Sequence, residues 1–281
     1  MKDNYGMVEY AKCQLGRGYA YGTIGAVFNR DIYNQKRKQY PNQYPPKKWT
    51  EESFTCLFGT KTHDCIGLFK GYLGCPDKDY NAGSTYDPRW DWSADGTIER
   101  CIVKGDIKTI PEIPGILVWK KGHVGCYIGD GKVIEAKGHA YGVIMSNLSD
   151  TKWKMWGEHP YITYLNAIQA FVGRLYRLVL NREPDQAGFE YWVNSLEDNF
   201  ITYTDCAYFF LTSDEFKNRR LSDAEFLDVL YHALFNRDGD AEGTAYWLDA
   251  LKVHTREYVI NCFLSSQEWM NVCLKFGGDY K

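Results

Sequence analysis

The first half of this 281-residue chain is organised around Thr62-His63-Asp64-Cys65-Ile66-Gly67-Leu68. Apolar residues recur at helical spacing after the cysteine, at Ile66, Phe69 and Leu73, and Gly74 is a typical helix end. We therefore predict a helix with Cys65 at its N-terminus. The half-positive end of a helix stabilises a thiolate, so we expect a lowered pKa for this thiol, as a nucleophile requires.

Three strands are predicted farther along the chain, at residues 114–119, 123–129 and 132–136. The turn Asp130-Gly131 joins the last two strands into a hairpin. In such a hairpin His123, at the start of one strand, lies beside Glu135, near the end of the next. Glu135 could then fix the tautomer of His123 and stabilise its imidazolium when Cys65 loses a proton.

Three ordered motifs connect this half to a known family. They are Gly18-Tyr19-Ala20-Tyr21-Gly22, Asp64-Cys65-Ile66-Gly67-Leu68 and His123-Val124-Gly125-Cys126-Tyr127-Ile128-Gly129-Asp130-Gly131. On these motifs residues 10–160 resemble the NlpC-type papain-like cysteine peptidases, which cut bacterial cell-wall peptides. Residues 156–162 and 69–73 resemble the phage endolysin branch. The resemblance implies an α+β domain at 1–162, with a helix-N-terminal cysteine packed on an antiparallel sheet.

The resemblance also implies roles for single residues. Cys65 would be the nucleophile, His123 the general base and Glu135 the residue that orients it. Substrate or oxyanion contacts would come from Tyr19, Asp64 and Trp119. Three positions depart from the family pattern, because Ile66 replaces a common Ser, Ile116 replaces a usual Asp, and Glu135 stands where His is frequent. His139 is an alternative third residue, and His63 is expected to line the cleft or to be exposed.

The second half is an internal repeat. Residues 171–182 match residues 226–237 at an offset of 55, and the register continues through the pairs Asp185/Asp240, Tyr191/Tyr246 and Trp192/Trp247. Apolar residues at helical spacing predict a few short helices per copy, with the aspartates as helix caps and the paired aromatics in the core. The repeat resembles a family of bacterial wall-associated helical domains of uncharacterised function. This resemblance implies an all-α targeting or interaction module at 165–281, with a wall glycan or a surface protein as its partner.

Composition excludes several classes of protein. Residues 1–160 hold 22 Lys and Arg against 18 Asp and Glu, and residues 161–281 hold 11 against 18, so the halves differ in charge but neither has a strong basic stripe. No nucleic-acid partner, membrane span or cofactor is expected. Cys56, His63, Cys65 and Cys75 could in principle bind zinc, but their spacing lacks the close Cys-x2-Cys pairs of zinc knuckles. Acidic residues at 236–242 could suggest a calcium loop, but Gly is absent from its sixth position. We interpret most of the nine cysteines as reduced and buried.

The sequence predicts a peptidoglycan hydrolase of the endolysin kind that cuts an amide or isopeptide bond of the stem peptide. Two alternatives stay open: an N-acetylmuramoyl-L-alanine amidase or other acyl-transfer enzyme, and a catalytically decayed wall-binding protein. The polar start of the chain has no apolar core of a signal peptide. We therefore expect synthesis in the cytoplasm and action at the wall after phage lysis or non-classical export. A Tyr-, Lys- and Pro-rich stretch up to about residue 52 is predicted to be an irregular insertion.

Overall fold

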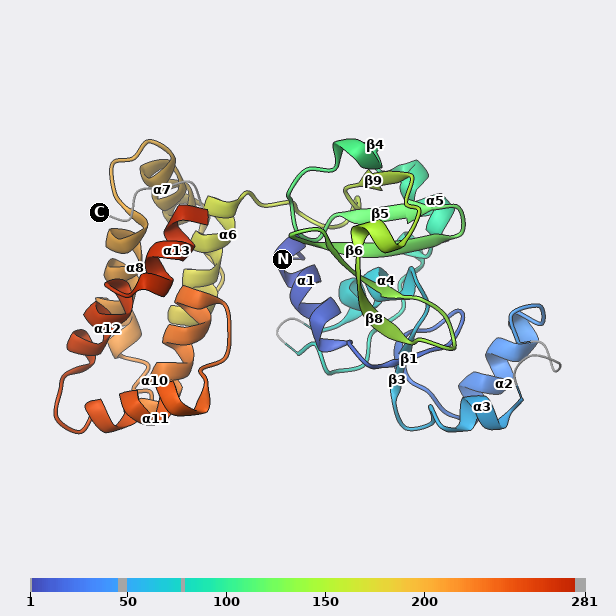
Figure 1. The fold of residues 1–281 in the computed structure, drawn as a ribbon, viewed down its shortest axis with the longest axis horizontal. Coiled ribbons are helices and arrows are strands. Elements are labelled where there is room, and N and C mark those ends of the chain that lie inside the picture. The colour runs from blue at the N-terminus through green and yellow to red at the C-terminus, as the bar shows by residue number, and fades with distance from the viewer. Residues whose placement is uncertain (1, 45–49, 77–78, 276–281) are drawn as a thin grey trace. The chain divides into compact units, whose positions relative to one another are not determined.

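Figure 1 shows a computed structural model of the chain, which describes residues 2–44, 50–76 and 79–275. The chain divides into two compact units, Met1–Tyr164 and Leu165–Lys281. The first unit combines helices with antiparallel strands and the second is helical, so the expected α+β class with an all-α module is confirmed. Each unit has its own hydrophobic core.

A six-stranded antiparallel sheet forms the centre of the first unit, in the order β4-β9-β5-β6-β7-β8. The strands are β4 (Lys104–Asp106), β5 (Leu117–Lys120), β6 (His123–Gly129), β7 (Lys132–Ala136), β8 (Val143–Asn147) and β9 (Met155–Gly157). The predicted hairpin is confirmed, because β6 pairs with β7 and both turn residues, Asp130 and Gly131, have positive φ. The strand predicted at 114–119 begins three residues later.

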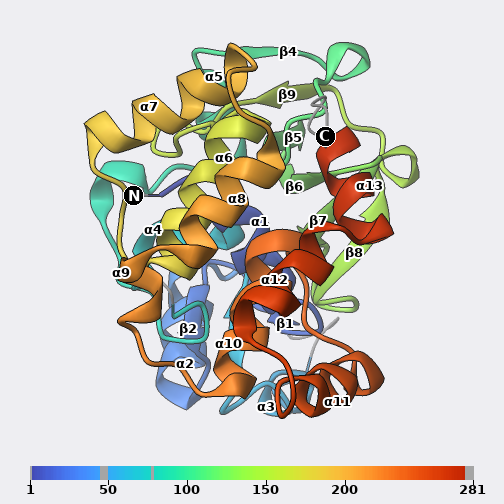
Figure 2. The same cartoon turned by 90° about the vertical axis from the view of Figure 1, so that its left-hand side faces the viewer.

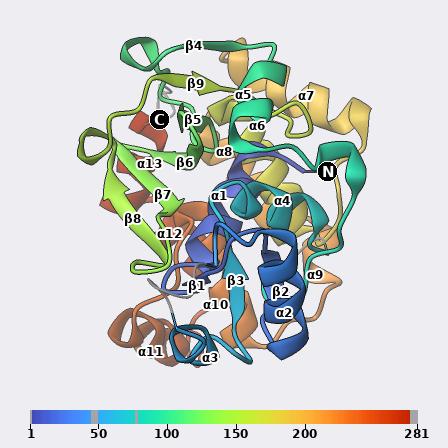
Figure 3. The same ribbon diagram turned by 90° about the vertical axis from the view of Figure 1, so that its right-hand side faces the viewer.

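Helices cover this sheet, and a smaller sheet of order β1-β3-β2 stands beside it (Figure 3). The bounds are α1 (Asn4–Cys13), β1 (Gly18–Tyr19), β2 (Ile24–Val27), β3 (Lys61–His63), α4 (Gly67–Gly74), η1 (Pro88–Trp90), α5 (Ala94–Arg100), η2 (Ile107–Thr109) and η3 (Leu148–Asp150). Met7 on α1, Leu68 on α4 and Val124 on β6 are fully buried in one cluster. This packing fixes α4, and with it the cysteine segment, against the central sheet.

The Tyr-, Lys- and Pro-rich stretch was predicted to be an irregular insertion, and in its described residues this is wrong; residues 45–49 lie outside the described residues. It contains α2 (Arg30–Gln39) and α3 (Glu52–Thr55). Asn29 caps α2 by accepting a hydrogen bond from the amide of Ile32. Aromatic rings then build a separate small core, formed by Ala20, Phe28, Tyr33, Tyr44 and Phe54. The prediction was wrong because α2 is rich in polar residues and, of its side chains, only that of Tyr33 is buried.

The second unit is built from helices whose pattern repeats (Figure 2). The bounds are α6 (Ala167–Arg174), η4 (Leu175–Val179), α7 (Gln186–Glu197), α8 (Tyr203–Thr212), α9 (Asp214–Lys217), α10 (Asp223–Leu230), η5 (Tyr231–Phe235), α11 (Ala241–Ala250), α12 (Arg256–Leu264) and α13 (Gln267–Lys275). An ion pair recurs in both copies, Arg182 with Glu215 and Arg237 with Glu268. Each copy therefore places corresponding residues in corresponding contacts.

Two expectations for the repeat have different outcomes. The aspartate caps are confirmed, since Asp185 accepts a hydrogen bond from the Gly188 amide at 2.9 Å and Asp240 caps α11 in the same way. The paired aromatics are only partly core residues. Trp192 and Trp247 pack against the core, but Tyr191 and Tyr246 are 62% and 64% exposed. Their side chains point away from the core because they precede the tryptophans by one helical position.

Three further properties of the described residues bear on function. No helix is long and apolar enough to cross a bilayer. The nine cysteines form no disulfide, and six of them are buried. No group of three or more His, Cys, Asp or Glu side chains is arranged to hold a metal ion.

Candidate active site

Asp64 fixes the segment that presents Cys65. The strand β3 ends at His63 and α4 begins at Gly67, so Cys65 lies just before the first helical turn. One carboxylate oxygen of Asp64 accepts the Gly67 amide at 2.6 Å, and the other accepts the Gly22 amide at 2.7 Å. A Cβ at Gly67 would lie 2.0 Å from the carbonyl oxygen of Thr23. Only glycine therefore allows the helix to start this close to the neighbouring backbone.

The thiol of Cys65 is buried, with 8% of the residue exposed. Burial, and secondly the charge of Asp64, raise its pKa to about 12, while the backbone amides of Val124, Ile66 and Cys65 act to lower it. The expectation of a lowered pKa is therefore wrong for the protein without substrate. The helix end does supply amides, but desolvation of a thiolate outweighs them.

His123 lies at the first position of β6, next to the turn that approaches the cysteine. The Cys65 Sγ is 4.0 Å from the carbonyl oxygen of Gly122. The Nε2 of His123 is 2.7 Å from Oε2 of Glu135, and the ring stacks on Trp153 with 5.4 Å between centroids. Since Nε2 is occupied by the carboxylate, Nδ1 is the nitrogen left to exchange a proton.

Glu135 on β7 is 1% exposed, yet several groups stabilise its charge. Its second oxygen accepts a hydrogen bond from Ser146 at 2.7 Å and lies 3.3 Å from the ammonium of Lys137. Burial alone raises the pKa of Glu135, but the hydrogen bonds from His123 and Ser146 and the charge of Lys137 bring it down to about 2. The carboxylate is therefore ionised at neutral pH and can support an imidazolium.

Asp95, at the start of α5, holds the turn before His123, and sequence reasoning missed it. One oxygen of its carboxylate accepts the Gly122 amide at 2.7 Å and the indole N–H of Trp119 at 2.9 Å. Trp119 was expected to contact substrate or the oxyanion, and its indole N–H is engaged within the protein. The sequence signal was Ser93, a helix-capping residue that places Asp95 in the first turn.

Tyr19 lies on β1, directly beside His63 of β3 in a parallel pair. Burial, and then the charges of Asp64 and Cys65, raise the pKa of Tyr19, so its phenol is neutral, and Tyr19 packs against the hydrophobic cluster that contains Cys65. The backbone carbonyl of Tyr19 is 3.1 Å from Nδ1 of His139, whose Nε2 is 3.0 Å from the carbonyl of Ser53. The structure thus brings together Tyr19 and the cysteine segment, and it places both ring nitrogens of His139 on other partners.

His63 neither lines the cleft nor is exposed, contrary to expectation. It is fully buried, and its Nε2 is 2.9 Å from the hydroxyl of Tyr10. Burial lowers the pKa of His63 to about 3, so the ring is neutral. Its place in β3, with all three residues buried, explains the difference, since that strand lies between β1 and β2.

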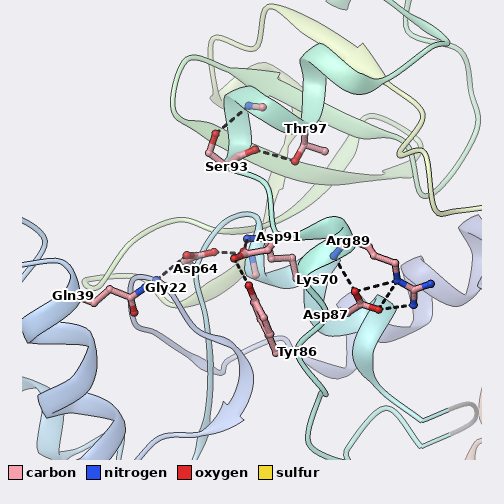
Figure 4. Close-up of polar contacts among 12 residues, drawn as sticks. Gly22, Gln39, Asp64, Lys70, Tyr86, Asp87, Arg89, Asp91, Ser93 and Thr97 are labelled. Atoms are coloured by element: carbon pink, nitrogen blue, oxygen red, sulfur yellow. Dashed lines mark hydrogen bonds and ion pairs between the residues drawn. The ribbon is translucent and has the colours of Figure 1, made fainter.

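Two hollows flank the segment that holds Tyr21. A cleft of about 640 Å³ is lined by Asp64 and Ile66, the two neighbours of Cys65, and also by Tyr21. A second hollow of about 330 Å³ is lined by Tyr19, Tyr21 and His139. Figure 4 shows the polar contacts of the first cleft, where Lys70, Tyr86 and Asp91 meet near Asp64.

Comparisons with known proteins agree with the division of the chain. Residues 163–220 and 207–273 each match the model of a domain of unknown function, DUF4214, so the second unit is similar to that domain over two overlapping stretches. No curated protein matches the sequence.

The first unit has distant matches among solved structures. NlpC2 and NlpC1 from Trichomonas vaginalis match 55% of this chain with 18% and 19% identity, each at a TM-score of 0.31. The match takes in 48% and 45% of those chains, so this chain spans less than half of their length. The NlpC/p60 domain of the peptidoglycan hydrolase SagA matches 56% of this chain over 98% of its own, with 14% identity and a TM-score of 0.32.

Proposed function

We propose that the first unit is a cysteine peptidase that hydrolyses an amide or isopeptide bond in the stem peptide of bacterial peptidoglycan. The single observation that supports this most is the 2.7 Å hydrogen bond between His123 and the buried carboxylate of Glu135, at the turn that approaches Cys65. A buried acid that holds one histidine nitrogen leaves the other for proton transfer. The choice of peptidoglycan rests on the resemblance of the three sequence motifs to the NlpC-type family.

The reaction begins when His123 Nδ1 takes the proton from Cys65 Sγ. The thiolate attacks the carbonyl carbon, and the amide of Cys65 donates to the oxyanion that forms. Return of the proton from His123 to the leaving amine breaks the carbon–nitrogen bond and leaves a thioester. Water, deprotonated by His123, then attacks the thioester, which releases the acid and restores the thiol. Because Glu135 stays ionised, the imidazolium is stabilised throughout these steps.

The second unit is proposed to bind the wall or a surface protein, and the whole chain to act at the wall after release from the cell that makes it. The exposed Tyr191 and Tyr246, at matching positions of the two copies, support a repeated contact surface. A catalytically decayed wall-binding protein is the second candidate. It is favoured by the raised pKa of Cys65, to about 12, which disfavours a free thiolate.

The test is lysis of purified walls by the wild type beside Cys65→Ala and His123→Ala, with mass analysis of the soluble fragments. The proposal predicts fragments from the wild type alone, and the newly freed amine identifies the bond and separates a peptidase from a muramoyl-alanine amidase. Equal lysis by Cys65→Ala would refute the cysteine mechanism. Binding to walls without product from any variant would favour the decayed protein.

A further inference from the structure

The inserted helix α2 forms part of the cleft beside Cys65. The cleft residues that come from this helix and its C-terminal cap are Ile32, Gln35, Lys36, Gln39 and Tyr40. Asp64 and Ile66 line the same cleft. A ligand in this cleft therefore meets the inserted helix as well as the two neighbours of Cys65.

The two acidic residues of the cleft already have partners. Both oxygens of Asp64 accept backbone amides, from Gly67 and Gly22. Asp91 forms an ion pair with Lys70 and accepts a hydrogen bond from Tyr86 at 2.8 Å (Figure 4). Lys70 is itself 8% exposed and committed to Asp91. Asp64, Asp91 and Lys70 therefore have their partners within the protein and need no ligand to satisfy them.

Lys36 is the cation of the cleft that lacks such a partner. Its ammonium lies 5.6 Å from the ring centroid of Tyr40 and 3.3 Å from the side-chain oxygen of Gln39. In the described part of the chain no carboxylate is within ion-pair distance of it. Burial lowers the pKa of Lys36, while the more distant charges of Asp64 and Asp91 oppose this. A partly desolvated ammonium with unused donors is stabilised by a carboxylate.

The backbone at Gly22 places Lys36 close to the nucleophile segment. Gly22 has a φ of 78°, and a Cβ there would lie 3.3 Å from Cδ of Lys36 and 2.5 Å from the ring of Tyr40. The alkyl chain of Lys36 therefore passes directly over Gly22. The amide of Gly22 donates a hydrogen bond to Asp64, and Asp64 directly precedes Cys65 in the sequence. Lys36 is therefore linked to the cysteine segment through Gly22 and Asp64.

We propose that Lys36 binds a carboxylate on a substrate residue next to the scissile bond, so that the enzyme prefers stem peptides with a free acid there. Peptides in which this acid is a carboxamide bind less well, because a charge-assisted hydrogen bond is about twice as strong as a neutral one. The inference rests on the proposed function for the class of substrate. It assigns the inserted helix a role in specificity.

The first test compares hydrolysis of L-alanyl-γ-D-glutamyl-L-lysine, with a free α-carboxylate on the glutamate, and of the same peptide with D-isoglutamine. The wild type is expected to have a kcat/KM about tenfold higher for the acid. Lys36→Met should reduce this preference to about one, and a midpoint of urea unfolding equal to that of the wild type should show that the variant is folded. Lys38→Met, at an exposed position of the same helix, should keep the preference.

The second test measures binding of the two peptides by calorimetry to Cys65→Ala, with and without Lys36→Met. A preference for the acid that Lys36→Met abolishes supports the inference even if no peptide is cut, and in that case the hydrolase proposal fails by itself. Wall cleavage by the wild type, together with equal affinity for both peptides or no binding of either, overturns the inference and leaves the hydrolase in place. Loss of the preference in Lys38→Met also overturns it.

Discussion

Replacement of Glu135 by Gln should destabilise the first unit by an amount that depends on pH. The pKa of Glu135 is about 2 instead of its ordinary 4.5. Each pKa unit corresponds to about 1.36 kcal/mol, so the folded state gains about 3 kcal/mol from the ionised carboxylate at neutral pH. Because the folded pKa is the lower one, this gain is complete above pH 4.5 and is lost as the pH falls towards 2. Glu135→Gln keeps the shape of the side chain but removes its charge.

The measurement is hydrogen exchange by mass spectrometry on peptides from β6, β7 and β8, in increasing urea at pH 7, 5 and 3. Wild type should exceed Glu135→Gln in the free energy of opening by about 3 kcal/mol at pH 7, and the difference should shrink towards zero near pH 2. His63 also weakens the fold in acid, since its folded pKa of about 3 lies below its ordinary 6.5. It contributes equally to both proteins, so only their difference reports on Glu135.

Ser146→Ala is the matched control, because it removes one hydrogen bond to the same carboxylate and leaves the charge. It should cost about 1.5–3 kcal/mol at neutral pH, since the lost hydrogen bond is to a charged group. A difference between wild type and Glu135→Gln that stays constant from pH 7 to pH 3 would refute the electrostatic reasoning. In wall lysis Glu135→Gln should lose about one to two orders of magnitude in rate, since a hydrogen bond to a charged group contributes about 1.5–3 kcal/mol.

Three other changes have defined outcomes. Asp95→Asn should lower kcat about tenfold with little change in KM, since the carboxylate positions the turn before the histidine rather than the substrate; a raised KM at constant kcat would contradict this. Gly67→Ala should lower the free energy of unfolding of the first unit by about 1–3 kcal/mol or more, because its Cβ meets the Thr23 carbonyl, whereas Gly83→Ala, with open space around it, should match the wild type in the same denaturation experiment. Ser222→Ala removes the cap of α10 and should destabilise the second unit by about 1 kcal/mol in urea; an unchanged midpoint would show that the capping box is not needed.

The hairpin and the repeat could be predicted because short-range signals determine them. A two-residue turn fixes which strand residues face each other, so His123 and Glu135 were placed on one face from sequence. The repeat needs only a constant offset between matching residues. Both predictions depend on local chemistry that is readable along the chain.

Helix α2, the pKa of Cys65 and the burial of His63 were not predicted correctly, because they depend on tertiary contacts that sequence patterns indicate only weakly. Helix α2 is held by aromatic packing against Phe28 and Phe54, which come from either side of it in the chain. The thiol pKa depends on how completely Cys65 is removed from water, and sequence position gives the helix end but not the burial. The burial of His63 was missed for the same reason, because the sequence did not predict the neighbouring strands β1 and β2.

Two backbone hydrogen bonds join the ends of the inserted segment. The amide of Phe28 donates to the carbonyl of Thr60 at 2.8 Å, and the amide of Gly59 donates to the carbonyl of Phe28 at 2.9 Å. These two bonds hold the ends of residues 28–60 together, and aromatic residues of the segment share a small core with Ala20. We expect the segment to behave as a cassette that can be exchanged without change to the central sheet, as long as its contacts with Tyr21 and His139 are replaced. If the proposed function holds, exchange of this one stretch of chain changes substrate preference while Cys65 and His123 stay in place.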